Sequence, residues 1–318
     1  MDWFIQISLG LLGGVMLYYG AEFLVKGGVS VALKFNISPL VIGLTLVAFA
    51  TSAPELVVSV VSTLQGHGDV ALGNATGSNI CNIGLILGLS AVIAPLPVNR
   101  KLLKLDMPLL MTSSLLLTLF FLLNKGVNRW QGALFFAGII AYTVWSVIAS
   151  RREGVPESDG GDEVEIKEVN IWLSLLLVAG GLLMLTFGAK FFVNCATFIA
   201  GCLGVPEAVI ALTVVALGTS LPELATSVVA ALKHEQDIAI GNVVGSNIFN
   251  ILCIMGAAPL VKPVTAPGLR LFDFGVMLLF AAALYLMMLC GKKISRAEGA
   301  LLLAMEFVYT GVLVARAL

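Results

Sequence analysis

Long apolar stretches separated by short polar ones make up nearly the whole chain. A helix needs about 20 mainly apolar residues to cross a bilayer. This length predicts ten spanning helices, near 3–25, 37–64, 70–94, 104–123, 129–149, 170–193, 204–232, 238–260, 271–290 and 298–315. The pattern therefore predicts an all-α integral membrane protein.

Two polar motifs interrupt the apolar segments, and each occurs twice at a spacing of 168 residues. Thr-Ser-Ala-Pro-Glu at 51–55 returns as Thr-Ser-Leu-Pro-Glu at 219–223, and Gly-Ser-Asn at 77–79 returns at 245–247. Because each copy holds five predicted helices, an odd number, the second copy must enter the membrane from the opposite side. The sequence thus predicts two inverted-topology repeats, 1–150 and 170–318, joined by an acidic cytoplasmic linker at 151–169.

Composition supports a membrane protein and argues against other classes. Hydrophobic residues make up 59% of the chain and charged residues 12%. Nucleic-acid binding is not expected, because no basic patch is interleaved with aromatic residues. Twelve of the 18 Lys and Arg fall on one side of the ten-helix map, which predicts that this side is cytoplasmic and that both termini are extracytoplasmic. We expect a multi-pass protein of the cell (inner) membrane, surrounded by the lipid bilayer, without an obligate protein partner.

The Thr-Ser-x-Pro-Glu motifs place a proline and a carboxylate near the middle of a span. Pro54 and Pro222 each remove a backbone donor, which predicts breaks in helices 2 and 7. The Gly-Ser-Asn runs predict loosened turns in helices 3 and 8, so all four helices are expected to be discontinuous. Glu55 and Glu223 lie where a charge costs roughly 2.5–3.5 kcal/mol, and no Lys or Arg in the matching stretches can pair with them. We therefore expect the two carboxylates to bind a cation.

Oxygen atoms around the two glutamates complete the predicted site. Hard cations such as calcium take about 6–8 oxygen ligands, and these positions offer neither the imidazole nor the thiolate that softer metals prefer. The predicted ligands are carboxylates, hydroxyls, amide oxygens and carbonyls freed by the breaks: Ala48, Thr51, Ser52, Glu55, Ser78, Asn82, Ala216, Thr219, Ser220, Glu223, Ser246 and Asn250. Asn79 and Asn247 are expected to bond backbone or neighbouring helices instead, because Ser and Asn four residues apart share the other helix face.

With these motifs the chain resembles the cation/calcium exchanger superfamily, in particular the prokaryotic type of its sodium/calcium exchanger branch with paired alpha-repeats. The resemblance implies a secondary active antiporter that exchanges sodium for calcium by alternating access. It also implies that helices 2, 3, 7 and 8 hold the ions while helices 1 and 6 slide across them, and that Glu55 and Glu223 are the acidic ligands. Asn250 departs from the pattern, since many relatives carry Asp there, and this weakens potassium co-transport and any stoichiometry taken from such relatives.

Two other functions stay open. A proton/cation antiporter would fit if the buried carboxylates carried protons. A cation channel would conduct without a counter-ion, although paired breaks around two carboxylates favour an occluded site. An enzyme is not expected, because no nucleophile-base set or phosphate loop is present, and no cofactor is expected beyond the transported sodium and calcium. Glu306 has no repeat mate, and a hydrogen bond to a neighbouring helix is expected for it rather than ion transport.

Overall fold

The computed structural model describes residues 2–153, 170–205, 210, 214 and 216–317. Within these residues, eight helices are long and apolar enough to cross a membrane, and one bent helix pair would make a ninth span. An all-α integral membrane fold is thus confirmed. The seventh expected helix, 204–232, and the linker from residue 154 onward include positions outside the described residues, so the count of ten stays a prediction.

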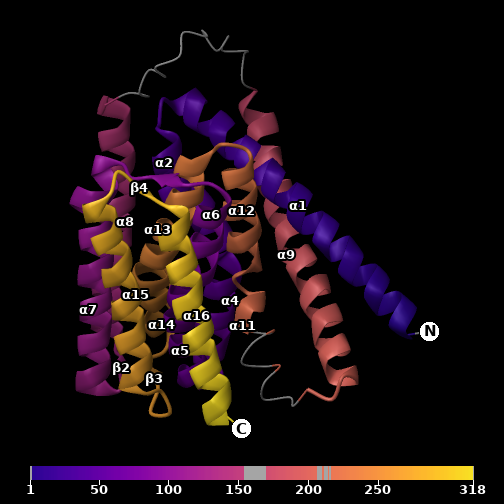
Figure 1. Ribbon diagram of the computed structural model, residues 1–318. Coiled ribbons are helices and arrows are strands. Elements are labelled where there is room, and N and C mark those ends of the chain that lie inside the picture. Colours follow the sequence, from indigo (N-terminus) through magenta and orange to yellow (C-terminus); the bar gives the residue numbers. More distant parts are fainter. Residues whose placement is uncertain (1, 154–169, 206–209, 211–213, 215, 318) are drawn as a thin grey trace.

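The helices are arranged as a bundle with one helix pair set apart from it (Figure 1). In chain order they are α1 (Asp2–Phe35), α2 (Pro39–Ile42), α3 (Ala48–Thr51), α4 (Ala53–Leu64), α5 (Gly68–Cys81), α6 (Gly88–Ile93), α7 (Met107–Asn124), α8 (Arg129–Glu153), α9 (Ile171–Cys202), α11 (Ala216–Gly218), α12 (Leu221–Leu232), α13 (Gln236–Phe249), α14 (Met255–Val261), α15 (Leu271–Cys290) and α16 (Arg296–Ala317). π-helical turns lie between some of them, at Gly43–Val47, Asn82–Leu87, Leu102–Asp106 and Asn250–Ile254.

The pair set apart is α1 and α9, which lie side by side and lean away from the bundle (Figure 1). They contain 34 and 32 residues. At a rise of 1.5 Å per residue each is about 50 Å long, so both must tilt to fit a hydrocarbon core of about 30 Å. Glycines let the two backbones touch, because a Cβ added to Gly13 would lie 2.7 Å from Gly188 O and one added to Gly181 would lie 2.7 Å from Gly20 O.

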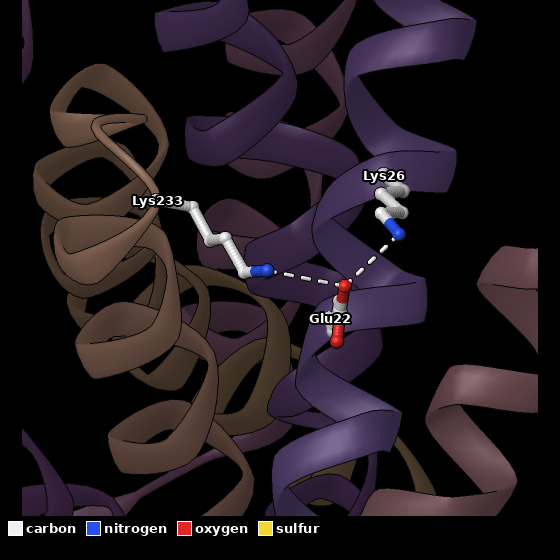
Figure 2. A network of polar contacts seen from close by, with 3 residues as sticks. All are labelled: Glu22, Lys26 and Lys233. Carbon is white, nitrogen blue, oxygen red and sulfur yellow. Dashed lines mark hydrogen bonds and ion pairs between the residues drawn. The ribbon is translucent and has the colours of Figure 1, made fainter.

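An ion-pair network connects α1 to the end of α12 (Figure 2). Glu22 Oε1 lies 2.9 Å from Lys26 Nζ on the same helix and 3.2 Å from Lys233 Nζ, just after α12. The hydrogen bond to Glu22 raises the pKa of Lys233. This network therefore links the tilted pair to the second half of the chain.

Helices 2 and 7 are broken where the prolines predict. In the first half, Ser52 leaves the helical conformation (φ −82°, ψ 5°) and Pro39–Thr51 meets Ala53–Leu64 at 46°. In the second half, Ser220 has nearly the same conformation (φ −88°, ψ 4°) and separates α11 from α12. Both predicted breaks are confirmed.

Helices 3 and 8 are not broken, so the prediction that they are discontinuous is wrong. Gly68–Ile93 and Gln236–Val261 each run through as spans of 26 residues. Each instead contains a π-helical turn, which begins at Asn82 in one and at Asn250 in the other. No proline follows the Gly-Ser-Asn runs closely enough to remove a backbone donor there, so a change of helical pitch takes the place of a break.

Short strands connect the two halves at both ends of the bundle. β1 (Leu96–Pro97) pairs antiparallel with β4 (Lys293–Ile294), and β2 (Gly126–Val127) pairs antiparallel with β3 (Val264–Thr265). The strand positions show that the spacing between the halves falls from 168 residues, β1 to β3, to 167, β2 to β4. The π-helical turn at Leu102–Asp106 accounts for the extra residue in the first half, since such a turn inserts one residue into a helix.

Candidate cation site

The two glutamates lie at the breaks and are held by each other's half. Glu55 is in the first turn of α4 and Glu223 in the first turn of α12, and both are 1% exposed. Ser52 Oγ donates to Glu223 Oε1 at 2.9 Å, and Ser220 Oγ lies 3.5 Å from Glu55 Oε1. The two breaks therefore meet, and the carboxylates share one buried region.

Several oxygen atoms in this region are buried without a hydrogen-bond partner. They are Glu55 Oε2, Glu223 Oε2, Asn82 Oδ1, Asn250 Oδ1, Thr219 Oγ1 and Ser246 Oγ. In the part of the chain that the structure describes, the ion pairs within 4.0 Å are those of Glu22, so no cationic side chain is paired with either central carboxylate. Buried polar atoms without partners are costly, and a cation would satisfy all six.

The serine and asparagine pairs of the Gly-Ser-Asn runs line the same region. Ser220 Oγ lies 3.4 Å from Ser78 Oγ, and Ser78 and Ser246 are 6% and 0% exposed. The structure thus brings both serines near the breaks from α5 and α13. Together with the two breaks, the predicted side-chain ligands of both motifs converge.

Asn79 and Asn247 make the contacts expected of them. Asn79 Nδ2 donates to Asn247 O at 3.3 Å, and Asn79 Oδ1 accepts from Asn250 Nδ2 at 3.0 Å. Asn247 Oδ1 accepts from Asn82 Nδ2 at 3.0 Å. These bonds confirm the prediction that the two asparagines bond backbone and neighbouring helices.

The backbone carbonyls differ between the halves. Ala48 O accepts from Ser52 N at 3.0 Å and from Thr51 Oγ1 at 3.3 Å, so the expected freeing of this carbonyl is not observed. The reason is that the chain keeps its helical bond up to Ser52. In the second half Ser220 N donates to Leu217 O at 3.1 Å, three residues back, and the bond four residues back, to Ala216 O, is replaced.

Two further asparagines, which sequence reasoning missed, fix the glutamates. Asn74 Nδ2 lies 3.4 Å from Glu55 O and 3.1 Å from Ser59 Oγ. Its counterpart Asn242 donates to Glu223 O at 3.3 Å and, at 2.9 Å, to the hydroxyl of the residue corresponding to Ser59. The signal was present, because Gly-Asn recurs at 73–74 and 241–242 at the same spacing as the other motifs.

The site is less exposed on one side than on the other. Thr51 Oγ1 donates to Asn242 Oδ1 at 3.0 Å, and both residues are fully buried. The counterparts Thr219 and Asn74 are only partly buried, and within the described chain Thr219 Oγ1 has no hydrogen-bond partner. We name the first contact the closed seam and the second the open seam.

Glu306, by contrast, lies apart from the convergent set. It is on α16, 7% exposed, and a Cβ added to Gly84 would collide with its carboxylate. Its Oε2 has no partner within the described residues, so the expected hydrogen bond is not observed there. Among those same residues, no group of three His, Cys, Asp or Glu side chains could hold a metal ion, so a cation here depends on hydroxyl, amide and carbonyl oxygens as well.

Comparison with known proteins identifies the family. The family model described as "Sodium/calcium exchanger protein" matches residues 5–148 and 173–315. The chain belongs to the sodium/calcium exchanger protein family. The "Putative antiporter CaxA" of Alkalimonas amylolytica is 39% identical over 310 residues, covering 94% of this chain and 95% of the relative. "Sodium/calcium exchanger MaX1" of Methanosarcina acetivorans is 33% identical, covering 95% and 97%.

Solved structures give the same result for the fold of this exchanger family member. A structure of the sodium-calcium exchanger NCX_Mj, soaked without sodium and calcium, matches with a TM-score of 0.83 and 33% identity. The match covers 98% of this chain and 99% of the other. The chain is therefore a cation/calcium exchange antiporter of the membrane and not an enzyme.

Proposed function

We propose that this protein exchanges sodium for calcium across the cell membrane by alternating access at one site between Glu55 and Glu223. The observation that carries the proposal is the set of six buried, unpartnered oxygens around these two carboxylates. Two carboxylates neutralise one divalent ion, and hydroxyl and amide oxygens supply the hard ligands that calcium and sodium prefer. Relatives named sodium/calcium exchanger support the choice of ions.

The proposed topology is ten helices in two inverted repeats, with both termini extracytoplasmic. The contacts support this symmetry, because the serine-carboxylate pairs and the asparagine pairs each recur at a spacing of 168 residues. The ends of α1 and α16 both lie toward the lower end of the bundle in Figure 1. The excess of Lys and Arg assigned to the opposite end places that end in the cytoplasm.

The two seams support alternating access. Asn74 lies near the start of α5, at the end of the molecule where β2 and β3 pair (Figure 1), so the partly exposed seam faces that end. In the proposed topology this is the extracytoplasmic side. Opening the closed seam while closing the open one would carry the site to the other side, and α1 with α9, which touch each other through glycines, would slide across the bundle.

Coupling follows from competition for the same atoms. A calcium ion would be neutralised by both carboxylates, and sodium ions entering the same oxygens would displace it. Neither ion state leaves the pair of charges uncompensated, whereas the empty site buries two negative charges at a cost. Loaded sites therefore favour the change of access, and the empty site resists it, which ties one flux to the other.

The test is calcium-45 uptake into proteoliposomes loaded with sodium, compared with vesicles loaded with potassium or choline. Uptake that requires internal sodium is the expected result. Glu306→Gln is a matched control, since it removes a buried carboxylate outside the convergent set and is expected to leave sodium-dependent uptake intact.

Other outcomes would favour the alternatives. Uptake driven by an imposed pH gradient and indifferent to sodium would replace the proposal with a proton/cation antiporter. Uptake that follows the calcium gradient alone would indicate a channel. A membrane potential imposed with valinomycin separates electrogenic from electroneutral exchange, since each net charge is worth about 2.3 kcal/mol per 100 mV.

A further inference from the structure

Four asparagines form two amide pairs that connect the halves directly beside the proposed site. Asn250 Nδ2 donates to Asn79 Oδ1, and Asn82 Nδ2 donates to Asn247 Oδ1, both at 3.0 Å. All four side chains are at most 1% exposed. Each pair therefore joins a predicted ligand on one half to a residue outside the ligand set on the other half.

The pairs determine which end of each ligand amide faces the cation. An amide has a donor end and an acceptor end, and the donor ends of Asn82 and Asn250 are used in the pairs. Their Oδ1 atoms are left buried without partners. Oxygen is the end that binds a hard cation, whereas an NH₂ group in its place would repel the ion.

The sense of one pair is fixed by the backbone. Asn79 Nδ2 also donates to the Asn247 carbonyl at 3.3 Å, and a backbone carbonyl can only accept. Asn79 must therefore turn its Oδ1 toward residue 250, and that oxygen in turn requires a donor there. Asn247 Nδ2 has no partner among the described residues, so its orientation is set less firmly.

We infer that Asn79 and Asn247 are positioning residues that hold the amide oxygens of Asn250 and Asn82 toward the cation and select an amide at both places. A carboxylate at 250 would set one of its oxygens against Asn79 Oδ1, two acceptors facing each other without a hydrogen. The negative charge of the site is thereby confined to Glu55 and Glu223. This inference rests on the proposed function, because it assigns a task at the same cation site.

A double-mutant cycle on the full-length purified protein tests the inference. Calcium affinity is measured by isothermal titration calorimetry in sodium-free choline buffer for the wild type, Asn79→Leu, Asn250→Ala and the double variant. Leu removes the acceptor, so Asn250 is free to turn its NH₂ group to the ion. We expect Asn79→Leu to weaken calcium binding about tenfold, or about 1.4 kcal/mol, but less than about twofold when residue 250 has no amide to orient.

Two comparisons separate orientation from packing. Met277 Sδ lies 3.9 Å from Asn79 Nδ2, so Met277→Leu disturbs the same pocket while keeping the acceptor, and it is expected to retain wild-type affinity. The cycle Asn247→Leu with Asn82→Ala should show the same pattern with a smaller first step, because Asn247 is held by fewer bonds. If Asn79→Leu does not fold, Asn79→Ser, whose hydroxyl is too short to reach residue 250, replaces it.

The outcomes distinguish this inference from the proposed function. A wild type that binds no calcium would overturn the proposed function itself. A wild type that binds calcium, with Asn79→Leu equally costly in the presence and absence of the residue 250 amide, would overturn the positioning role alone. Equal losses in Met277→Leu and Asn79→Leu would also overturn it, because packing would then explain the effect.

Discussion

The two seams of the site contain counterpart residues in different arrangements. At the closed seam a Cβ added to Gly245 would lie 2.7 Å from both Leu44 O and Ala48 Cβ. At the open seam no described atom lies within 4 Å of a Cβ added to Gly77, although Gly77 is the counterpart of Gly245. Nearly identical motifs therefore adopt two packings in one molecule, and this is the property that a site with alternating access requires.

The largest expected effect comes from removing the charge that both seams share. Glu55→Gln or Glu223→Gln keeps the shape of the side chain but leaves a single carboxylate for a divalent ion. We expect sodium-dependent calcium-45 uptake to fall about 100-fold, the equivalent of about 2.7 kcal/mol. If either variant transported at wild-type rates, the two halves would not share one site.

The second prediction compares the two glycines directly. Gly245→Ala must push the closed seam apart, and overpacking of this kind costs about 1–3 kcal/mol. Gly77→Ala should leave the thermal stability of the purified protein nearly unchanged, because its methyl group meets open space. Both variants should lose transport, since Gly77 must enter a tight seam when access changes. Full transport by Gly77→Ala would contradict the proposed exchange of seams.

The third prediction concerns a pair of polar contacts away from the site. Tyr142 OH donates to Asp106 Oδ1 at 2.9 Å in the first half, and Tyr309 OH donates to Asp273 Oδ1 at 3.1 Å in the second. Asp106 is fully buried, whereas the second pair is partly buried. Tyr142→Phe should therefore lower stability by about 1–3 kcal/mol, and Tyr309→Phe by less. Equal losses in thermal unfolding would show that burial does not distinguish the halves.

The smallest expected effect comes from the ion pairs of Glu22 (Figure 2). The counterparts of Glu22 and Lys233 are Lys190 and Gln65, which cannot form an ion pair, so this contact favours one packing of α1 only. Lys233→Gln should shift the protein slightly toward the other access state, as labelling of engineered cysteines at each seam would show. Lys26→Gln is the control within α1.

Salt should remove this effect. At 1 M salt the Debye length is about 3 Å, so wild type and Lys233→Gln should then label alike. A difference that persists at high salt would assign the effect to packing of the lysine stem rather than to its charge.

The sequence predicted the membrane fold, the motif duplication, both proline breaks and the convergence of the paired motifs. The reason is that Pro54, Glu55 and their counterparts have strong local consequences in an apolar segment. The π-helical turns were not predictable, because Asn82 and Asn250 lie in apolar runs that suit any helical pitch. The shift of spacing from 168 to 167 residues was missed for the same reason, since Leu102–Asp106 reads as ordinary helix.

The long-range polar pairs also could not be predicted. Asn74 and Asn242 recur at the expected spacing, yet their bonds to Glu55 O and Glu223 O depend on how α5 and α13 pack against the breaks. The difference between the seams was beyond the sequence as well, because nearly identical motifs carry no information about which one is closed.

The central claim is that calcium and sodium use the same oxygens between the halves. The most direct test is calcium binding by isothermal titration calorimetry at increasing sodium, with choline holding ionic strength constant. We predict that the apparent calcium dissociation constant rises without limit as sodium increases. A dissociation constant that ignores sodium, or that levels off at high sodium, would contradict a shared site.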